Sequence, residues 1–266
     1  IYDFLKFDQK KSITCFYKTL IFVILSSYIS PNFSVFTVFY YLYFFKKINI
    51  KHIYLSFFMC LACSLPALYY LFILDVNFLI ASTPGAILDE TVNLDFNISN
   101  KILIVGSIIL FHLIPFLINK EFLSKFLKFL KTNLILVFIF FIFNIYFFDY
   151  LVVFTGGGIF FQISNLILNN NIIFYFLSFL SLLILAYFFK YNIYNAVLYT
   201  LVILSNVQNT IYHKYYDPFI MIIFFLMTIH FLPERFVSHK KNLIILYLFY
   251  FIFIFSRIFK NLVFKY

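Results

Sequence analysis

Long apolar runs separated by short polar stretches dominate this sequence. A helix needs about 20 apolar residues to cross the hydrocarbon core of a bilayer. The runs have this length or somewhat less, and they predict membrane segments at 13–30, 34–46, 53–74, 102–118, 133–149, 172–189, 194–206, 217–232 and 242–258. The sequence therefore predicts an all-α fold, a polytopic transmembrane helix bundle with about 8–9 segments, some of them short or broken helices. One transmembrane domain would cover 1–266.

The composition agrees with a membrane protein. Hydrophobic residues make up 64% of the chain and charged residues 11%, against about 45–50% and about 25% in ordinary globular domains. These fractions exclude a soluble enzyme, a disordered chain and a disulfide-stapled secreted domain. The net charge of +10 reflects the basic residues that collect in the cytoplasmic loops of membrane proteins. We therefore expect no nucleic-acid partner.

The basic residues predict the orientation of the chain. With the N-terminus in the cytoplasm and alternating segments, the inner loops hold Lys6, Lys10, Lys11, Lys18, Lys46, Lys47, Lys51, Lys120, Lys125, Lys128, Lys131, Lys190, Arg235, Lys240 and Lys241. Only Lys101 and Lys214 fall in outer loops, so the positive-inside rule favours this orientation. The basic C-terminus, with Arg257, Lys260 and Lys265, is discordant. We expect an integral protein of the inner or plasma membrane, with 121–131 as a cytoplasmic interfacial helix.

Three outer loops carry candidate chemistry. The loop 75–100 contains the adjacent acids Asp89 and Glu90, and paired carboxylates can bind a metal or act as general bases; a solvated loop is the alternative. A later loop contains Gly156, Gly157 and Gly158, three of the five glycines in the chain. Glycines let the backbone approach a ligand, and successive N–H groups can form an anion nest. A tight turn at the membrane surface explains them equally well.

A third outer loop, 205–218, is the densest polar cluster of the chain. It contains His213, Lys214, Tyr215 and Tyr216. An outward-facing cation beside histidine and tyrosine suits an anionic group such as a phosphate at the lipid surface. Tyrosine is also common at membrane interfaces for reasons unrelated to a site. Here we favour binding of a lipid phosphate.

The segment 213–227, HKYYDPFIMIIFFLM, resembles the basic-Tyr-x-x-Pro start of a late transmembrane helix in GT-C glycosyltransferases, and 28–44 resembles their short broken helix pair. This resemblance implies a sugar donor linked to a polyprenyl phosphate. It also implies that Lys214 occupies the position of the phosphate-binding basic residue, with Tyr215 or Tyr216 as the tyrosine. The family's catalytic acid lies in the first outer loop, and no counterpart precedes Pro31. We therefore expect a fragment that lacks the N-terminal part.

The resemblance favours an integral membrane glycosyltransferase of cell-envelope polysaccharide biosynthesis. The enzyme would transfer a hexosyl group from a lipid-phosphate-linked donor to an acceptor on the outer face. His213, Lys214, Tyr215, Tyr216 and the three glycines would then bind the donor phosphate, and Asp89 or Glu90 would position the acceptor or a metal. No cofactor is certain, and a divalent metal stays open. A polysaccharide polymerase or ligase and a non-enzymatic lipid or solute transporter are the alternatives.

Overall fold

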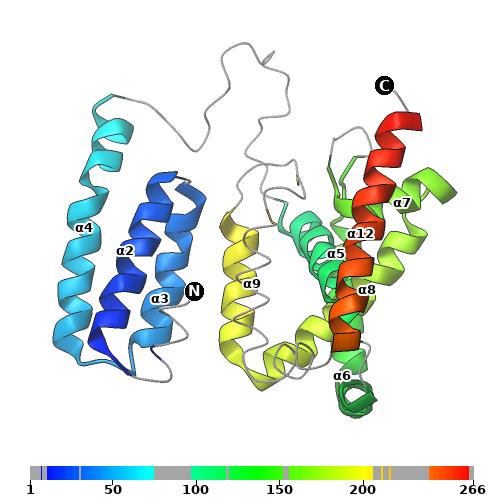
Figure 1. Cartoon of the computed structure of the whole chain (residues 1–266), viewed down its shortest axis with the longest axis horizontal. Coiled ribbons are helices and arrows are strands. Elements are labelled where there is room, and N and C mark those ends of the chain that lie inside the picture. Colours follow the sequence, from blue (N-terminus) through cyan, green and yellow to red (C-terminus); the bar gives the residue numbers. More distant parts are fainter. Residues whose placement is uncertain are drawn as a thin grey trace.

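The computed structural model describes residues 7, 11–29, 31–74, 97–117, 120–151, 156–205, 211, 216 and 240–263. Every regular element in these ranges is helical. In chain order they are α2 (Ile13–Ile29), the 3-10 helix η1 (Pro31–Val35), α3 (Phe36–Phe44), α4 (Ile50–Phe72), α5 (Ile98–Leu117), α6 (Lys120–Tyr146), α7 (Gly158–Leu168), α8 (Ile172–Tyr191), α9 (Ile193–Ser205) and α12 (Lys240–Val263). Most of these helices stand side by side (Figure 1), which confirms the predicted all-α bundle.

Four helices are long and apolar enough to cross a membrane. They are Ile50–Tyr70, Ile98–Leu117, Phe122–Tyr146 and Ile172–Tyr191. The protein is therefore membrane-embedded. Within the ranges described, this number of long spans is lower than the nine predicted segments, because 13–30, 34–46, 194–206 and 242–258 correspond to shorter apolar helices. The predicted segment 217–232 lies outside the described residues.

The two ends of the bundle differ in charge. The end where α3 turns into α4, α6 begins and α8 ends holds exposed cations; we call it the lysine end, defined by Lys46, Lys47, Lys128, Lys131 and Lys190. The opposite end is the glycine end, defined by Asn97, Asp149 and Gly156–Gly158. The lysines that the sequence predicts inside thus gather at one end of the described structure. The orientation of that end in the membrane stays a prediction.

Helix α5 forms the centre of the bundle and packs on α6, α7, α8 and α9. Its small residues permit this close packing. A Cβ atom added to Gly106 would lie 3.0 Å from Ser181 Oγ and 3.2 Å from Tyr199 Oη. In lipid, association of helices depends on such close contact, since the hydrocarbon is as apolar as the side chains. Helix α5 is therefore a protein-facing span.

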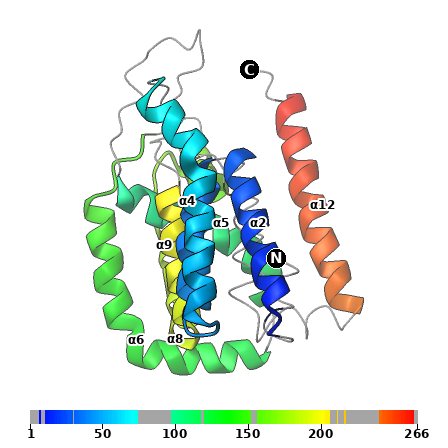
Figure 2. The ribbon, with the colours of Figure 1, turned by 90° about the vertical axis from the view of Figure 1, so that its left-hand side faces the viewer.

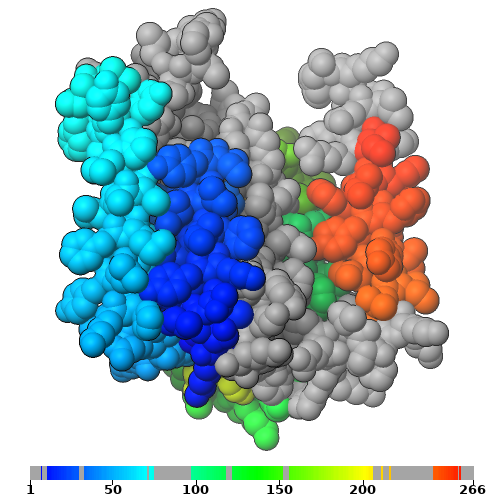
Figure 3. Space-filling view, turned by 60° about the vertical axis from the view of Figure 1, so that its left-hand side comes forward, coloured from blue at the N-terminus to red at the C-terminus, as the bar shows by residue number. Residues whose placement is uncertain are grey.

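The helices α2, η1, α3 and α4 lie beside this centre, with α3 against α9 (Figures 1 and 2). Aromatic rings fill the contact: Tyr43 and Phe39 of α3 both pack edge-on against Tyr194, with centroids 5.2 and 6.3 Å away. Helix α4 forms an outer edge of the molecule (Figure 3). Most of its large side chains are exposed, as expected for a helix that faces lipid.

Helix α6 bends, so that its first part crosses the lysine end of the bundle and its second part runs along it (Figure 2). Between the lysine-bearing and apolar parts, Thr132 Oγ1 and Asn133 Nδ2 both donate to the Phe129 carbonyl, at 3.0 Å each. Side chains that compete for helix carbonyls favour bending. The predicted interfacial helix 121–131 is thus continuous with the span that follows it, and its place at the membrane surface stays a prediction.

Candidate functional site

A carboxylate at the glycine end is held by two asparagine side chains. Asp149 lies three residues after the end of α6. Its Oδ1 atom accepts hydrogen bonds from Asn97 Nδ2 at 2.7 Å and from Asn100 Nδ2 at 2.6 Å. The Asp149 backbone N–H donates to Asn100 Oδ1 at 3.1 Å. Both amides converge on Oδ1, and the Asp149 side chain is exposed, so the carboxylate is held through one oxygen and is accessible.

The start of α5 explains why the two asparagines point to the same acid. Asn97 precedes the first helical residue, and its Oδ1 accepts from the Asn100 N–H at 3.0 Å, as an N-cap side chain does. Its Nδ2 also donates to the Phe147 carbonyl at 3.0 Å. Residues three apart lie on one side of a helix. The cap of α5 and the end of α6 therefore form one hydrogen-bonded unit.

The three glycines form a turn next to this carboxylate. Gly156, Gly157 and Gly158 have φ angles of +133°, +77° and +78°, a region that side chains with a Cβ rarely adopt. The Gly157 N–H donates to the Ile211 carbonyl at 2.9 Å, and the Ile211 N–H donates to Tyr150 Oη at 3.2 Å. The turn thus joins the segment after Asp149 to the segment after α9.

There is no room for side chains on two faces of this turn. A Cβ on Gly156 would lie 2.6 Å from the Ile211 carbonyl oxygen and 2.9 Å from Tyr150 Oη. A Cβ on Gly158 would lie 3.0 Å from Ile108 Cγ1 of α5. Close packing therefore accounts for these glycines, and the Gly157 N–H is used within the protein. Their predicted role in donor binding stays a prediction.

Lys101 differs from its expected position in an outer loop. It lies in the first turn of α5, one residue after Asn100, and only 1% of its surface is exposed. Burial of an ammonium group is costly unless protein groups compensate for the lost water. Lys101 is thus a buried cation next to Asn100 in the chain. Asn100 bonds Asp149, the only acidic side chain that the structure describes at the glycine end.

Of the other predicted site residues, one lies within the described structure. Tyr216 is completely buried, so its ring belongs to the core of this end. Asp89, Glu90, His213, Lys214 and Tyr215 lie outside the described residues, and their roles stay predictions. The structure brings together the glycine turn and Ile211, which the sequence assigned to two separate outer loops.

Sequence reasoning missed Asn97, Asn100 and Tyr150 as parts of this site. Asparagine is abundant in the chain, so a single asparagine is a weak signal of a functional site. Two signals were available: the i, i+3 spacing of the asparagines at the start of an apolar run, and an acid directly after another apolar run. Among the residues that the structure describes, no three His, Cys, Asp or Glu side chains are placed to hold a metal ion.

Comparison of the chain with protein-family models, with curated proteins and with solved structures gave no match. A functional proposal therefore rests on the geometry of the glycine end and on the resemblance of the segment 213–227.

Proposed function

We propose that the protein is an integral membrane glycosyltransferase that transfers a sugar from a lipid-phosphate-linked donor to an acceptor at the glycine end. The observation that carries this proposal is the exposed Asp149 carboxylate, fixed through Oδ1 by Asn97 and Asn100. A general base must be held within reach of the proton that it removes. The resemblance of 213–227 to GT-C glycosyltransferases supports the same reaction class.

In this reaction Asp149 acts as the general base. Oδ2 accepts the proton of the acceptor hydroxyl while the hydroxyl oxygen attacks the anomeric carbon of the donor. The bond from that carbon to the lipid phosphate breaks, and the phosphate leaves with the electron pair. The configuration at the anomeric carbon inverts. The two amides keep the carboxylate in place, which lowers the entropic cost of reaching the transition state.

Cations would stabilise the phosphate as it leaves. His213 and Lys214 are the residues that the family resemblance assigns to this group, and positive charge aimed at a developing anion lowers the barrier. The glycine turn bonds to Ile211, only two residues before His213 in the chain, which supports the proposal that this group lies near the turn. Asp89 or Glu90 remains the proposed contact for the acceptor or a metal.

The test uses membranes that contain the full chain, a polyprenyl phosphate that carries a radiolabelled hexose, and a panel of glycan acceptors. Asp149→Asn keeps the size of the side chain but removes the base, so we expect transfer to fall by about 10²–10⁴-fold. Lys214→Ala should abolish transfer with normal expression and membrane insertion.

Thr200→Ala is the control, because the exposed Thr200 hydroxyl donates to the Ala196 carbonyl within α9. It should leave transfer at the wild-type rate. Absence of sugar transfer by the wild-type chain would refute the glycosyltransferase proposal. Transfer by Asp149→Asn at the wild-type rate would refute only the role of Asp149.

A further inference from the structure

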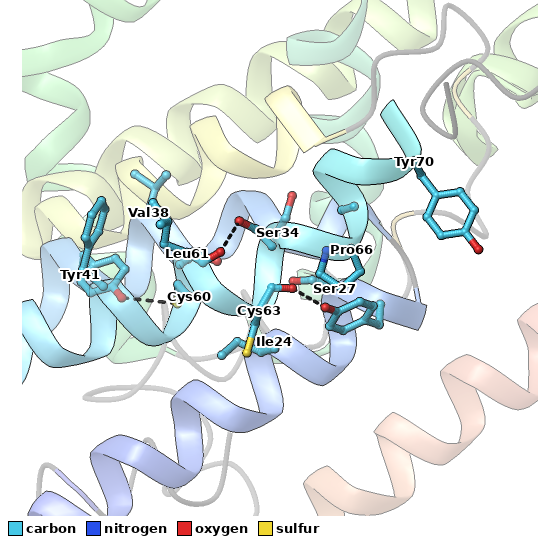
Figure 4. Close-up of a pocket in the computed structure, with 15 residues that line it drawn as sticks. Ile24, Ser27, Ser34, Val38, Tyr41, Cys60, Leu61, Cys63, Pro66 and Tyr70 are labelled. Carbon is cyan, nitrogen blue, oxygen red and sulfur yellow. Dashed lines mark hydrogen bonds between the residues drawn. The ribbon is translucent and has the colours of Figure 1, made fainter. Parts of the chain in front are cut away.

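A cavity of about 750 Å³ lies between α2, α3 and α4, away from the glycine turn. Figure 4 shows its wall, and most of the lining is apolar. Helix α4 contributes one face to it, with Cys60, Ser64 and Ala67 among the lining residues. Small residues on a membrane helix usually allow a neighbouring helix to approach closely. Among the described residues they border open space instead.

Several of the hydroxyl groups around the cavity are bonded to the protein. Ser27 Oγ donates to the Val23 carbonyl at 2.8 Å, and Ser64 Oγ donates to the Leu61 carbonyl at 2.8 Å. Tyr28 Oη donates to the carbonyl of Cys63. Such hydroxyls have no need of a polar ligand, because their donors are used. The wall therefore suits a hydrocarbon better than a sugar, an ion or a polar solute.

The cavity is about as long as one leaflet is deep. Its lining on α4 extends from Phe57 to Tyr70, a distance of about 20 Å at a rise of about 1.5 Å per residue. One leaflet of hydrocarbon is about 15 Å deep, half of a core of about 30 Å. The long axis of the cavity also has the direction of an acyl chain, since α4 runs from the lysine end toward the glycine end (Figures 1 and 2).

Tyr70 marks the end of the cavity where a head group would lie. It lies in the last turn of α4 and is more than half exposed, whereas the Tyr28 hydroxyl donates to the Cys63 carbonyl of α4. Tyrosine is enriched at membrane–water interfaces, where the ring is apolar and the hydroxyl is wet. Helix α4 also forms an edge of the molecule (Figure 3), so a chain can enter from the bilayer.

We propose that this cavity binds one acyl chain of a phospholipid from the leaflet at the glycine end. The occupant fits on three grounds: a mostly apolar wall on which several hydroxyls are bonded to the protein, a length close to that of one leaflet, and an exposed tyrosine at one end. A polyprenyl chain is much longer than one leaflet and fits less well. The inference does not depend on the proposed glycosyltransferase, because no residue of the cavity belongs to the glycine-end site.

The test compares lipids that copurify with the full chain after detergent extraction and extended washing. Mass spectrometry of the extracted lipid should find one phospholipid retained by the wild-type protein. Ala67→Phe places a ring in the cavity and should lose this lipid. Leu65→Phe makes a similar addition at a side chain of α4 that is 58% exposed and does not line the cavity, and it should retain the lipid.

Equal phospholipid in the wild type and in Ala67→Phe, with both proteins folded by circular dichroism, would overturn the inference. Retention of a polyprenyl lipid instead of a phospholipid would also overturn it. A second measurement covers failure of Ala67→Phe to fold. Wild-type protein in phosphatidylcholine vesicles with a diazirine on the acyl chain should form photo-adducts at Cys60, Ser64 or Ala67. Adducts confined to outward residues such as Phe58 and Leu65 would contradict the proposal.

Discussion

Helices α4 and α5 are nearly equal in length and in mean hydropathy, yet they occupy opposite environments. The candidate spans of α4 and α5 have 21 and 20 residues, with mean hydropathies of 1.6 and 1.9. However, only 11% of the apolar stretch in α4 is buried inside the protein, against 78% of that in α5. Hydropathy measures how favourably a side chain moves out of water. It does not distinguish lipid from the protein interior, because both are apolar. Side-chain size at the contacts distinguishes them: Gly106 of α5 faces Ser181 of α8, whereas the small residues of α4 face a cavity.

The strongest test of this difference is to enlarge a small residue in each helix. Gly106→Leu would force a side chain into the space held by Ser181 and Tyr199, and we expect a loss of about 3 kcal/mol in stability from overpacking. Ala62→Leu adds a similar bulk, one carbon less, at an exposed position of α4 and should change stability by less than about 0.5 kcal/mol. Thermal unfolding in detergent measures both. Equal losses would show that α4 is as tightly packed as α5.

Truncating a leucine in each helix gives a smaller expected effect. Leu103 of α5 is completely buried, whereas Leu65 of α4 is 58% exposed. Leu103→Ala should cost about 2 kcal/mol, because the cavity left behind loses packing contacts even where no water is involved. Leu65→Ala should be nearly neutral, since lipid fills the gap. A marked loss in Leu65→Ala, measured by the same unfolding assay, would place a protein partner on that face.

The smallest of these effects concerns the polar unit at the start of α5. Asn100→Ala removes the amide that bonds Asp149 Oδ1 and the carbonyl that accepts from the Asp149 N–H. We expect a loss of about 1–2 kcal/mol, the usual cost of leaving such groups unsatisfied. Asn133→Ala breaks bonds within one helix only and should cost less. An unchanged unfolding temperature in Asn100→Ala would mean that water replaces the amide without cost.

Local patterns predicted much of the fold. The segments at 53–74, 102–118 and 172–189 agree closely with α4, α5 and α8, because each is a long apolar run bounded by polar residues. The pattern failed where a boundary depends on geometry. The interfacial segment 121–131 and the span 133–149 fall within one helix, α6, since no Gly or Pro separates them. Helix α7 has 11 residues and was not predicted, because a run of that length looks like part of a loop.

The candidate site could be predicted only in part. The rarity of glycine made 156–158 conspicuous, and the positive φ angles agree with a turn that requires glycine. The partners of that turn could not be read from the sequence, because Ile211 is more than 50 positions away and has an ordinary apolar side chain. The same holds for Asn97 and Asp149, which meet across 52 positions. Pairings of this kind are set by the packing of α5 against α6.

The bend in α6 also helps to fix the position of Asp149, which lies just after the other end of the helix. A straight apolar helix in lipid can rotate about its axis or slide at little cost. In α6 the arm that crosses the lysine end stacks Phe122, Phe126 and Phe129 edge-on against Tyr187, with centroids 5.4–5.8 Å away. Rotation of the span would swing this arm off Tyr187. The contact of this arm with Tyr187 therefore fixes the rotation of α6, and with it the position of Asp149. Aromatic rings at the lysine end thus help to position a carboxylate at the glycine end.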